Sequence, residues 1–268
     1  TGNPAVAFVS DGDIQIAGTV TVKAGKFTGD PDCEGTKGTC ETVVVGENTA
    51  VICGGGSGAG FGGHGGDPGV SENGTSNFSG GNVSGDADLE PLRGGCESPG
   101  FSMFGSAIRA PGGAIQLVSR TKIEILPGGF LDLNGTGGQV HSLGGFAGSG
   151  GASGGAALLE APLVTVAASA GIAANGGGGA GGCANGGDGG LSASRAQGAD
   201  CSEGDGGDGG AGGTKDGTTG SNATDPLSAG NGGGGAGRIR INTPIGKFLP
   251  EGGAIVSPTP STGTLGTR

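Results

Sequence analysis

Residues that could carry catalysis are scarce in this chain of 268 residues. The two histidines, His64 and His141, lie among glycines, and His64 holds the third place of a Gly-Gly-X triplet, where we expect solvent exposure. Residues 151–155, Gly-Ala-Ser-Gly-Gly, fit the G-x-S-x-G pattern of a nucleophilic serine. Glycine and serine are so abundant that chance produces such a match, and no strand-to-helix pattern surrounds it. The sequence therefore predicts no enzyme and no cofactor.

Aspartates recur in the glycine-rich part of the chain, at Asp188, Asp205 and Asp208. Carboxylates of this kind can hold calcium. The calcium-binding nonapeptide, however, requires an aliphatic residue two places after its aspartate, and none follows here. In an extended polyproline-II chain, residues three apart are separated by about 9 Å, too far for two carboxylates to share one ion. We expect no metal site, and structural calcium remains a minor alternative.

Five N-x-S/T sequences are candidate sites of glycosylation, which would add bulky surface groups. They begin at Asn73, Asn77, Asn82, Asn134 and Asn222. Three of the five fall in one stretch between the third and fourth cysteines.

The chain has an even number of cysteines and no C-x-x-C pair, which favours disulfides over a zinc site. They are Cys33, Cys40, Cys53, Cys96, Cys183 and Cys201. Pairing between nearest neighbours would join 33 to 40, 53 to 96 and 183 to 201. Disulfides indicate an oxidising, extracellular location. The sequence begins at Thr1 without a hydrophobic leader, which we interpret as a mature form after removal of a signal peptide.

Charge and hydropathy exclude two classes of partner. The net charge is −11, with 13 basic residues that form no cluster, so nucleic acid and anionic membranes are unfavourable partners. Residues 156–174 are apolar over nearly the length of a membrane span. A repeat places Arg120 and Lys122 at the matching positions of its other copy, so we expect no membrane span.

That repeat is the main sign of organisation. Residues 115–135 align without a gap on residues 156–176, so that Ile115 falls on Ala156, and a looser third copy starts at Arg238. Within a copy, apolar residues alternate in pairs that recur every eight residues, which is typical of short half-buried strands. The same alternation of apolar residues occurs in residues 5–9, 13–22 and 41–45. The sequence predicts an all-β fold with essentially no α-helix, either a short-strand β-solenoid, which we favour, or a stacked β-sandwich.

The glycine-rich tracts contain Gly-Gly-X triplets, and glycine supplies 72 residues. Three residues complete one turn of a polyproline-II helix, so the bare glycine faces would let neighbouring chains pack closely. We expect a bundle of such helices, known as polyglycine II, rather than a flexible linker. The prediction is a single composite domain, 1–268. Its β segments are 5–53, 112–134, 154–174 and 236–256, and its glycine-rich excursions are 54–110, 135–153 and 175–235.

The pattern GGA-I-x-L, V-x-V or I-x-I, then x-NGGGG resembles the glycine-rich repeat proteins that myxobacteria and some other bacteria secrete. It covers roughly residues 112–182 and 232–256. The triplets resemble the polyglycine-II bundles of springtail antifreeze proteins and of phage tail-tip adhesins. The resemblance implies an extended glycine bundle and no particular activity.

Three functions fit these patterns. We favour a structural subunit of an extracellular fibre, filament or sheath that assembles with itself by adding strands between subunits. The expected connector is the apolar segment Ala5, Val6, Ala7, Phe8 and Val9, for which we expect no partner strand in its own chain. The alternative is an adhesin or coat protein whose glycan or receptor is unknown. Ice binding is less favoured, because the triplets carry aspartate, asparagine, histidine and phenylalanine at their third positions.

Overall fold

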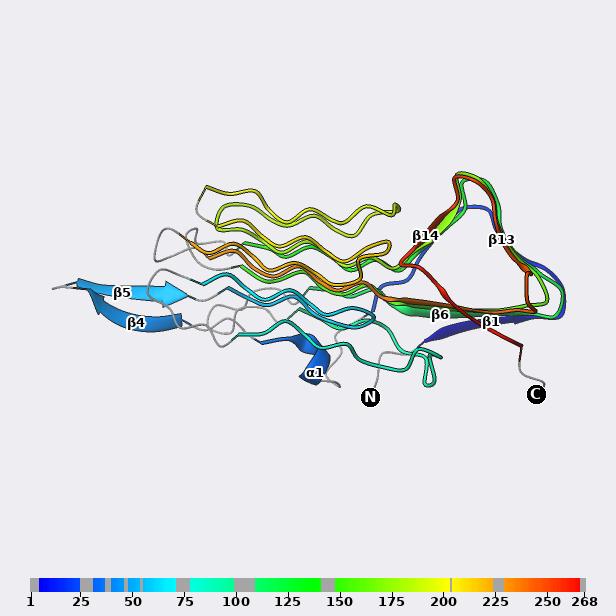
Figure 1. The fold of residues 1–268 in the computed structure, drawn as a ribbon, viewed down its shortest axis with the longest axis horizontal. Helices are drawn as coiled ribbons and strands as arrows, with labels where there is room; N and C mark the ends of the chain where they lie inside the picture. The colour runs from blue at the N-terminus through cyan, green and yellow to red at the C-terminus, as the bar shows by residue number, and fades with distance from the viewer. Residues whose placement is uncertain are drawn as a thin grey trace.

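The structure is a computed structural model. It describes residues 5–24, 31–36, 40–45, 48–53, 55–70, 78–98, 109–140, 148–202, 204–223 and 229–265. Figure 1 shows two joined parts, a triangular solenoid of short strands and a layered set of extended glycine-rich segments that run away from it.

The solenoid consists of four coils of three strands each and one additional strand. Coil 1 contains β1 (Val6–Ser10), β2 (Ile14–Ile16) and β3 (Thr19–Thr21). Coil 2 contains β6 (Ala114–Ser119), β7 (Ile123–Ile125) and β8 (Phe130–Asp132). Coil 3 contains β9 (Ala156–Glu160), β10 (Val164–Val166) and β11 (Gly171–Ala173). Coil 4 contains β12 (Arg238–Asn242), β13 (Phe248–Pro250) and β14 (Ile255–Ser257), and β15 (Ser261–Gly263) follows it.

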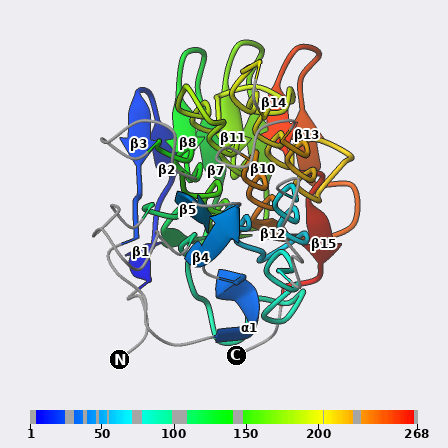
Figure 2. The same cartoon turned by 90° about the vertical axis from the view of Figure 1, so that its left-hand side faces the viewer.

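Strands of successive coils pair in parallel and form three sheets. Sheet A has the order β1-β6-β9-β12-β15, sheet B the order β13-β10-β7-β2, and sheet C the order β14-β11-β8-β3. Figure 2 shows the coils side by side, from coil 1 to coil 4. Each coil contributes one strand to each sheet, which confirms the predicted all-β solenoid and excludes the stacked sandwich.

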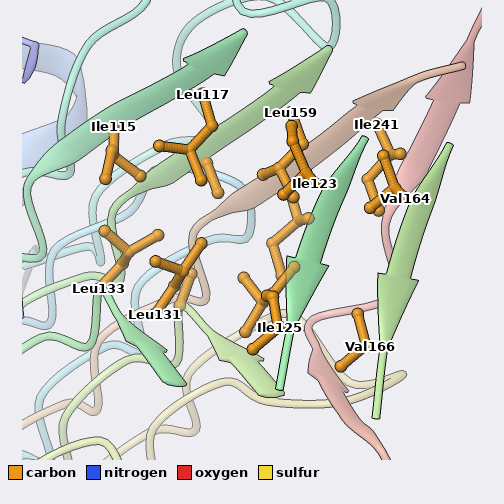
Figure 3. Close-up of a cluster of buried hydrophobic side chains, with 14 of the residues drawn as sticks. Ile115, Leu117, Ile123, Ile125, Leu131, Leu133, Leu159, Val164, Val166 and Ile241 are labelled. Carbon is orange, nitrogen blue, oxygen red and sulfur yellow. The ribbon is translucent and has the colours of Figure 1, made fainter. Parts of the chain in front are cut away.

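Alternating side chains fill the interior of the coils. Ile115 and Leu117 of β6 and Leu159 of β9 point inward towards side chains from the other two sheets (Figure 3). All three are at most 1% exposed. Burial of such side chains contributes about 1.5–3 kcal/mol each, which makes this stack the hydrophobic core of the molecule.

The gapless alignment of the repeat is wrong by one residue in the first strand of the coil. Ile115 pairs with Ala157, not with Ala156, whereas Ile123 pairs with Val164 as aligned. The corner that connects the first two strands is one residue shorter in coil 3. A slip of one residue would turn every inward side chain outward, so burial selects the observed register.

The predicted strand at 41–45 exists, but it lies outside the solenoid. It belongs to β4 (Cys40–Val45), which pairs in antiparallel fashion with β5 (Asn48–Cys53). This hairpin projects at the far end of the glycine-rich part (Figure 1). The single-turn helix α1 (Pro31–Glu34) precedes it. Residues 5–53 are therefore not one β segment: coil 1, a helical turn and a separate hairpin follow one another.

The glycine-rich segments between coils form a hydrogen-bonded bundle, which we call the polyglycine bundle. Segment 229–237 lies at its centre. Its N–H groups donate in three directions, to carbonyls of segments 215–221, 55–60 and 174–180. Along segment 229–237, every third N–H group donates to the same neighbouring segment. The carbonyl groups of segment 229–237 accept hydrogen bonds from other segments: Gly66 N donates to Gly233 O, and Gly151 N donates to Gly232 O. This threefold pattern is that of polyglycine II. The donor pairs are Gly230–Ser221, Gly233–Thr218, Ala236–Lys215, Gly232–Gly56, Gly235–Ala59, Asn231–Ala180, Gly234–Gly177 and Gly237–Ala174.

An apolar cluster packs the bundle against the solenoid. Phe61, at the inner end of a glycine-rich segment, is buried against Ala156 and Leu158 on the outer face of sheet A. The guanidinium of Arg238 lies 5.7 Å from the centre of the Phe61 ring, within cation–π range. Its Nη2 also donates to the carbonyl of Ser84 at 3.0 Å. The bundle is thereby held against the coils by a local apolar cluster.

Candidate assembly surface

The solenoid is open at its coil-1 end. β1, β2 and β3 are the terminal strands of sheets A, B and C, and no described segment pairs with their outer edges. Parallel strands expose alternating N–H and C=O groups along such an edge. Three adjacent open edges around one core form a surface onto which another three-stranded coil fits.

The core itself is exposed at this end. A hollow of about 430 Å³ is lined by Phe8, Ile14, Ile16 and Val20, with Leu117 of coil 2 among the residues at its base. Phe8 is 52% exposed, although its partner Leu117 in the next coil is 1% exposed. The difference arises because nothing described covers coil 1. Solenoids require terminal caps with a polar outer face to remain separate, and this end has none among the described residues.

The connector predicted at residues 5–9 has a different position from the one expected. It is not a free arm that lacks a partner in its own chain, because β1 pairs along its whole length with β6. Val6 and Phe8 lie in register with the inward Ile115 and Leu117, whereas Ala7 lies in register with outward Gln116. The open feature is therefore the outer edge of β1 and its inward side chains, Val6 and Phe8.

A charged rim borders the coil-1 end. Lys122 Nζ lies 3.4 Å from Asp13 Oδ2 and 3.0 Å from Glu124 Oε1. A hydrogen bond from Thr121 and the nearby ammonium hold the pKa of Asp13 below its ordinary value. A hydrogen bond from Gln15 to Glu124, followed by Lys122, lowers the pKa of Glu124. Asp13 of coil 1 is thus paired with Lys122 of coil 2 along this rim.

The coil-4 end is covered over sheet A only. β13 and β14 terminate sheets B and C, but β15 lies on β12 in sheet A. Ile245 and Leu249 are 95% and 50% exposed at this end. Lys247 precedes β13 as Lys122 precedes β7, and in the described part of the chain its ammonium has no ion pair. Both ends of the solenoid therefore present apolar side chains and unpaired strand edges.

A second surface feature crosses the outer face of sheet A. It is a groove of about 760 Å³ that extends from Val9 past Arg120 and Arg240 to Leu265. Its polar side chains bond mainly to one another: Arg240 pairs with Asp88 at 2.8 Å. The groove is thus charged, with Arg240 ion-paired within the chain and Glu160 bonded to the amides of Gln116 and Asn242.

The aspartates considered as calcium ligands accept backbone hydrogen bonds instead. Asp188 Oδ1 accepts from Gly137 N at 2.7 Å, and Asp208 Oδ1 accepts from Gly198 N at 2.9 Å. Asp205 Oδ1 accepts from Cys201 N at 2.7 Å, three residues further along the segment that contains Gly198. These carboxylates satisfy N–H groups at the edge of the bundle, where no further glycine segment lies. The same arrangement recurs at Asp67, Asn185, Asp216 and Asn222, and the buried Asn231 accepts from Gly56 N inside the bundle. Among the described residues, no group of three metal-binding side chains gathers.

Ser153, the middle residue of the G-x-S-x-G match, is fully buried within the bundle. Its Oγ accepts from Cys96 N at 2.7 Å and donates to the carbonyl of the same residue. His64 is exposed at its triplet position, as expected, and His141 lies outside the described residues. The serine is therefore a structural hydrogen-bonding group.

The five N-x-S/T sequences differ in the solvent exposure of their asparagines. Asn82 and Asn222 are exposed, whereas Asn134 is 1% exposed and accepts a hydrogen bond from Asn175 N at 2.7 Å. The Asn134 side chain is therefore inaccessible in the folded chain, and its glycosylation stays an untested prediction. Asn73 and Asn77 lie outside the described residues.

Two disulfides are present among the described side chains. Cys183 bonds to Cys201, as expected, with Cα atoms 5.8 Å apart. Cys33 bonds to Cys96, with Cα atoms 5.9 Å apart, so the predicted pairs 33–40 and 53–96 are wrong. Sequence proximity fails as a guide because segments that neighbour each other in the bundle are distant in sequence. The backbone of the remaining two cysteines, Cys40 and Cys53, is paired across the β4–β5 hairpin.

No helix in the described part of the chain has the length and apolarity needed to cross a membrane. Comparison with known proteins yields no match to a family model, a curated protein or a solved structure.

Proposed function

We propose that this chain is a structural subunit of an extracellular fibre, filament or sheath, and that its subunits assemble by stacking their solenoids end to end. The observation that carries the proposal is the open coil-1 end, where three strand edges and the core hollow at Phe8 are exposed together. A monomer that retained this surface would carry an aggregation hazard that most proteins block with charge or proline. The disulfides support an oxidising, extracellular location.

The contact is directional. The coil-1 end of one subunit faces the coil-4 end of the next, and these two surfaces differ. Such head-to-tail contacts generate open filaments rather than closed dimers. The polyglycine bundle, perpendicular to the stacking direction in Figures 1 and 2, would then project from the side of the filament at every subunit. With a net charge of −11, finished filaments would repel one another.

The test uses two substitutions on β1 that introduce the same side chain. Phe8→Asp places a charge against the exposed core and should abolish elongation while coils 2–4 remain folded. Ala7→Asp is the matched control, because residue 7 faces outward beside Gln116, and it should elongate like the unmodified chain. Sedimentation velocity and electron microscopy over a range of concentrations report assembly. Elongation of the Phe8→Asp variant at the normal concentration would refute the proposal.

The second candidate is an adhesin or coat protein, and the groove across the outer face of sheet A favours it. A protein that remains monomeric at all concentrations and binds a glycan or protein through this groove would support the adhesin. Arg240→Ala, which alters the groove, should then reduce binding.

A further inference from the structure

We propose that β15 occupies on β12 the place that β1 of the next subunit takes, so that elongation proceeds by exchange of one strand for the other. This inference rests on the proposed function and identifies its contact: the acceptor is the outer edge of β12, and the partner is β1 of a second copy of this chain.

The three sheets differ in their number of strands, and the inference rests on this difference. Sheet A has five strands, whereas sheets B and C have four. If the next subunit continues sheets B and C directly, its β2 lies on β13 and its β3 on β14. Its β1 must then lie on β12, because coil 1 is one continuous turn of the solenoid. That position is held by β15.

β15 is a weaker occupant than β1 would be. Its register pairs are limited to Arg240, Ile241 and Asn242, with Thr262 over Ile241, and Gly263 O also accepts from Thr243 N at 2.9 Å. β15 reaches the preceding residue of β12, Ile239, through a side chain, since Ser261 Oγ donates to Ile239 O at 3.4 Å. β15 contributes no apolar side chain to the core, since its sequence is Ser-Thr-Gly.

β1 offers a longer and more apolar match. Following the strand registers through the coils, Val6 falls in the column of Ile239 and Phe8 in the column of Ile241. In its own chain β1 already pairs five residues with β6 in this register. Exchange would replace Thr262 by Phe8 above Ile241 and would cover the exposed core at both ends, which favours the assembled state.

Charge supports the same register. Asp13 precedes β2, and in its own chain it meets Lys122, which precedes β7. With β2 of the next subunit on β13, Asp13 would lie one strand spacing, about 4.8 Å, from the backbone position of Lys247. Lys247 would gain the carboxylate partner that it lacks within the described residues, just as Lys122 has Asp13 in its own chain.

The test compares the full chain with a chain that ends at Pro258 and with a Thr262→Ile variant. Removal of 259–268 should lower the critical concentration for assembly, measured by pelleting, about tenfold or more, because no strand must be displaced. Thr262→Ile should raise the critical concentration, because it strengthens the contact of β15 with Ile241. This second variant keeps the test valid if the shortened chain does not fold.

The outcomes separate the two proposals. If all three proteins assemble at one critical concentration, β15 is not displaced and this inference is wrong, while the proposed function stands. If none of them assembles, the proposed function itself fails, and the exchange fails with it.

Discussion

A single methyl group should test the polyglycine bundle. Gly233 is central in it: its N–H donates to Thr218 O at 3.0 Å and its carbonyl accepts from Gly66 N at 2.8 Å. A Cβ at this position would overlap the carbonyl group of Asp208 and lie 2.8 Å from Gly207 O. All of these atoms belong to backbone, so relief requires that two segments move apart.

The cost of Gly233→Ala follows from this geometry. Overpacking of a rigid interior costs typically 1–3 kcal/mol, and each weakened backbone hydrogen bond adds about 1 kcal/mol. We expect a loss of about 3 kcal/mol in the free energy of unfolding. For a chain of this size that corresponds to a fall of about 6 °C in Tm, measurable by differential scanning calorimetry.

Gly213→Ala is the matched control, because no atom lies within 4 Å of a Cβ built there. It should leave Tm unchanged or raise it slightly, since alanine restricts the unfolded chain. Equal shifts for the two variants would refute the bundle, because they would mean that the interior glycines lie in ordinary loops.

Three further expectations concern the described contacts. Non-reducing peptide mapping should link Cys40 to Cys53, whose backbones pair in the hairpin, and free thiols there would contradict this. Asp208→Asn should preserve stability because it keeps the oxygen that accepts from Gly198 N, whereas Asp208→Ala should cost about 1–2 kcal/mol in a denaturant titration; equal losses would exclude the role. Because the pKa of Asp13 is held below its ordinary 3.8, its contribution is present above that pH and is lost as pH falls through the lowered value. Hydrogen exchange of coil 1, corrected for intrinsic rates, should therefore accelerate as the pH falls below 3.8 through the lowered pKa of Asp13, and Asp13→Asn should flatten this dependence.

The solenoid was accessible from sequence because its strands carry a strict inward pattern. Ile123 and Ile125 recur as Val164 and Val166, and this repetition favours stacked coils, with a stacked sandwich left as the alternative. The one-residue error at Ile115 arose at a corner, where no buried side chain reports the length of the connection. Gly-Gly-X triplets likewise indicated polyglycine II, because three residues make one turn.

Contacts between segments of the bundle were not accessible in the same way. Each segment has nearly the same sequence, so nothing in the pattern specifies which segments become neighbours, and the Cys33–Cys96 disulfide depends on that choice. The role of Asp208 was also missed, because a carboxylate that accepts one N–H group resembles any exposed acidic residue. Similarly, β1 was predicted to lack a partner, since its match to β6 spans the whole first glycine-rich excursion.

The most direct test of end-to-end stacking is electron cryomicroscopy of material grown from the full-length protein. Four coils at a strand spacing of about 4.8 Å give an axial rise of about 19 Å per subunit, with sheets B and C continuous from one subunit to the next. Filaments with this rise and with Phe8 buried at each junction are expected. A protein that stays monomeric up to its solubility limit, or filaments joined through the bundles with both solenoid ends free, would contradict the proposed function.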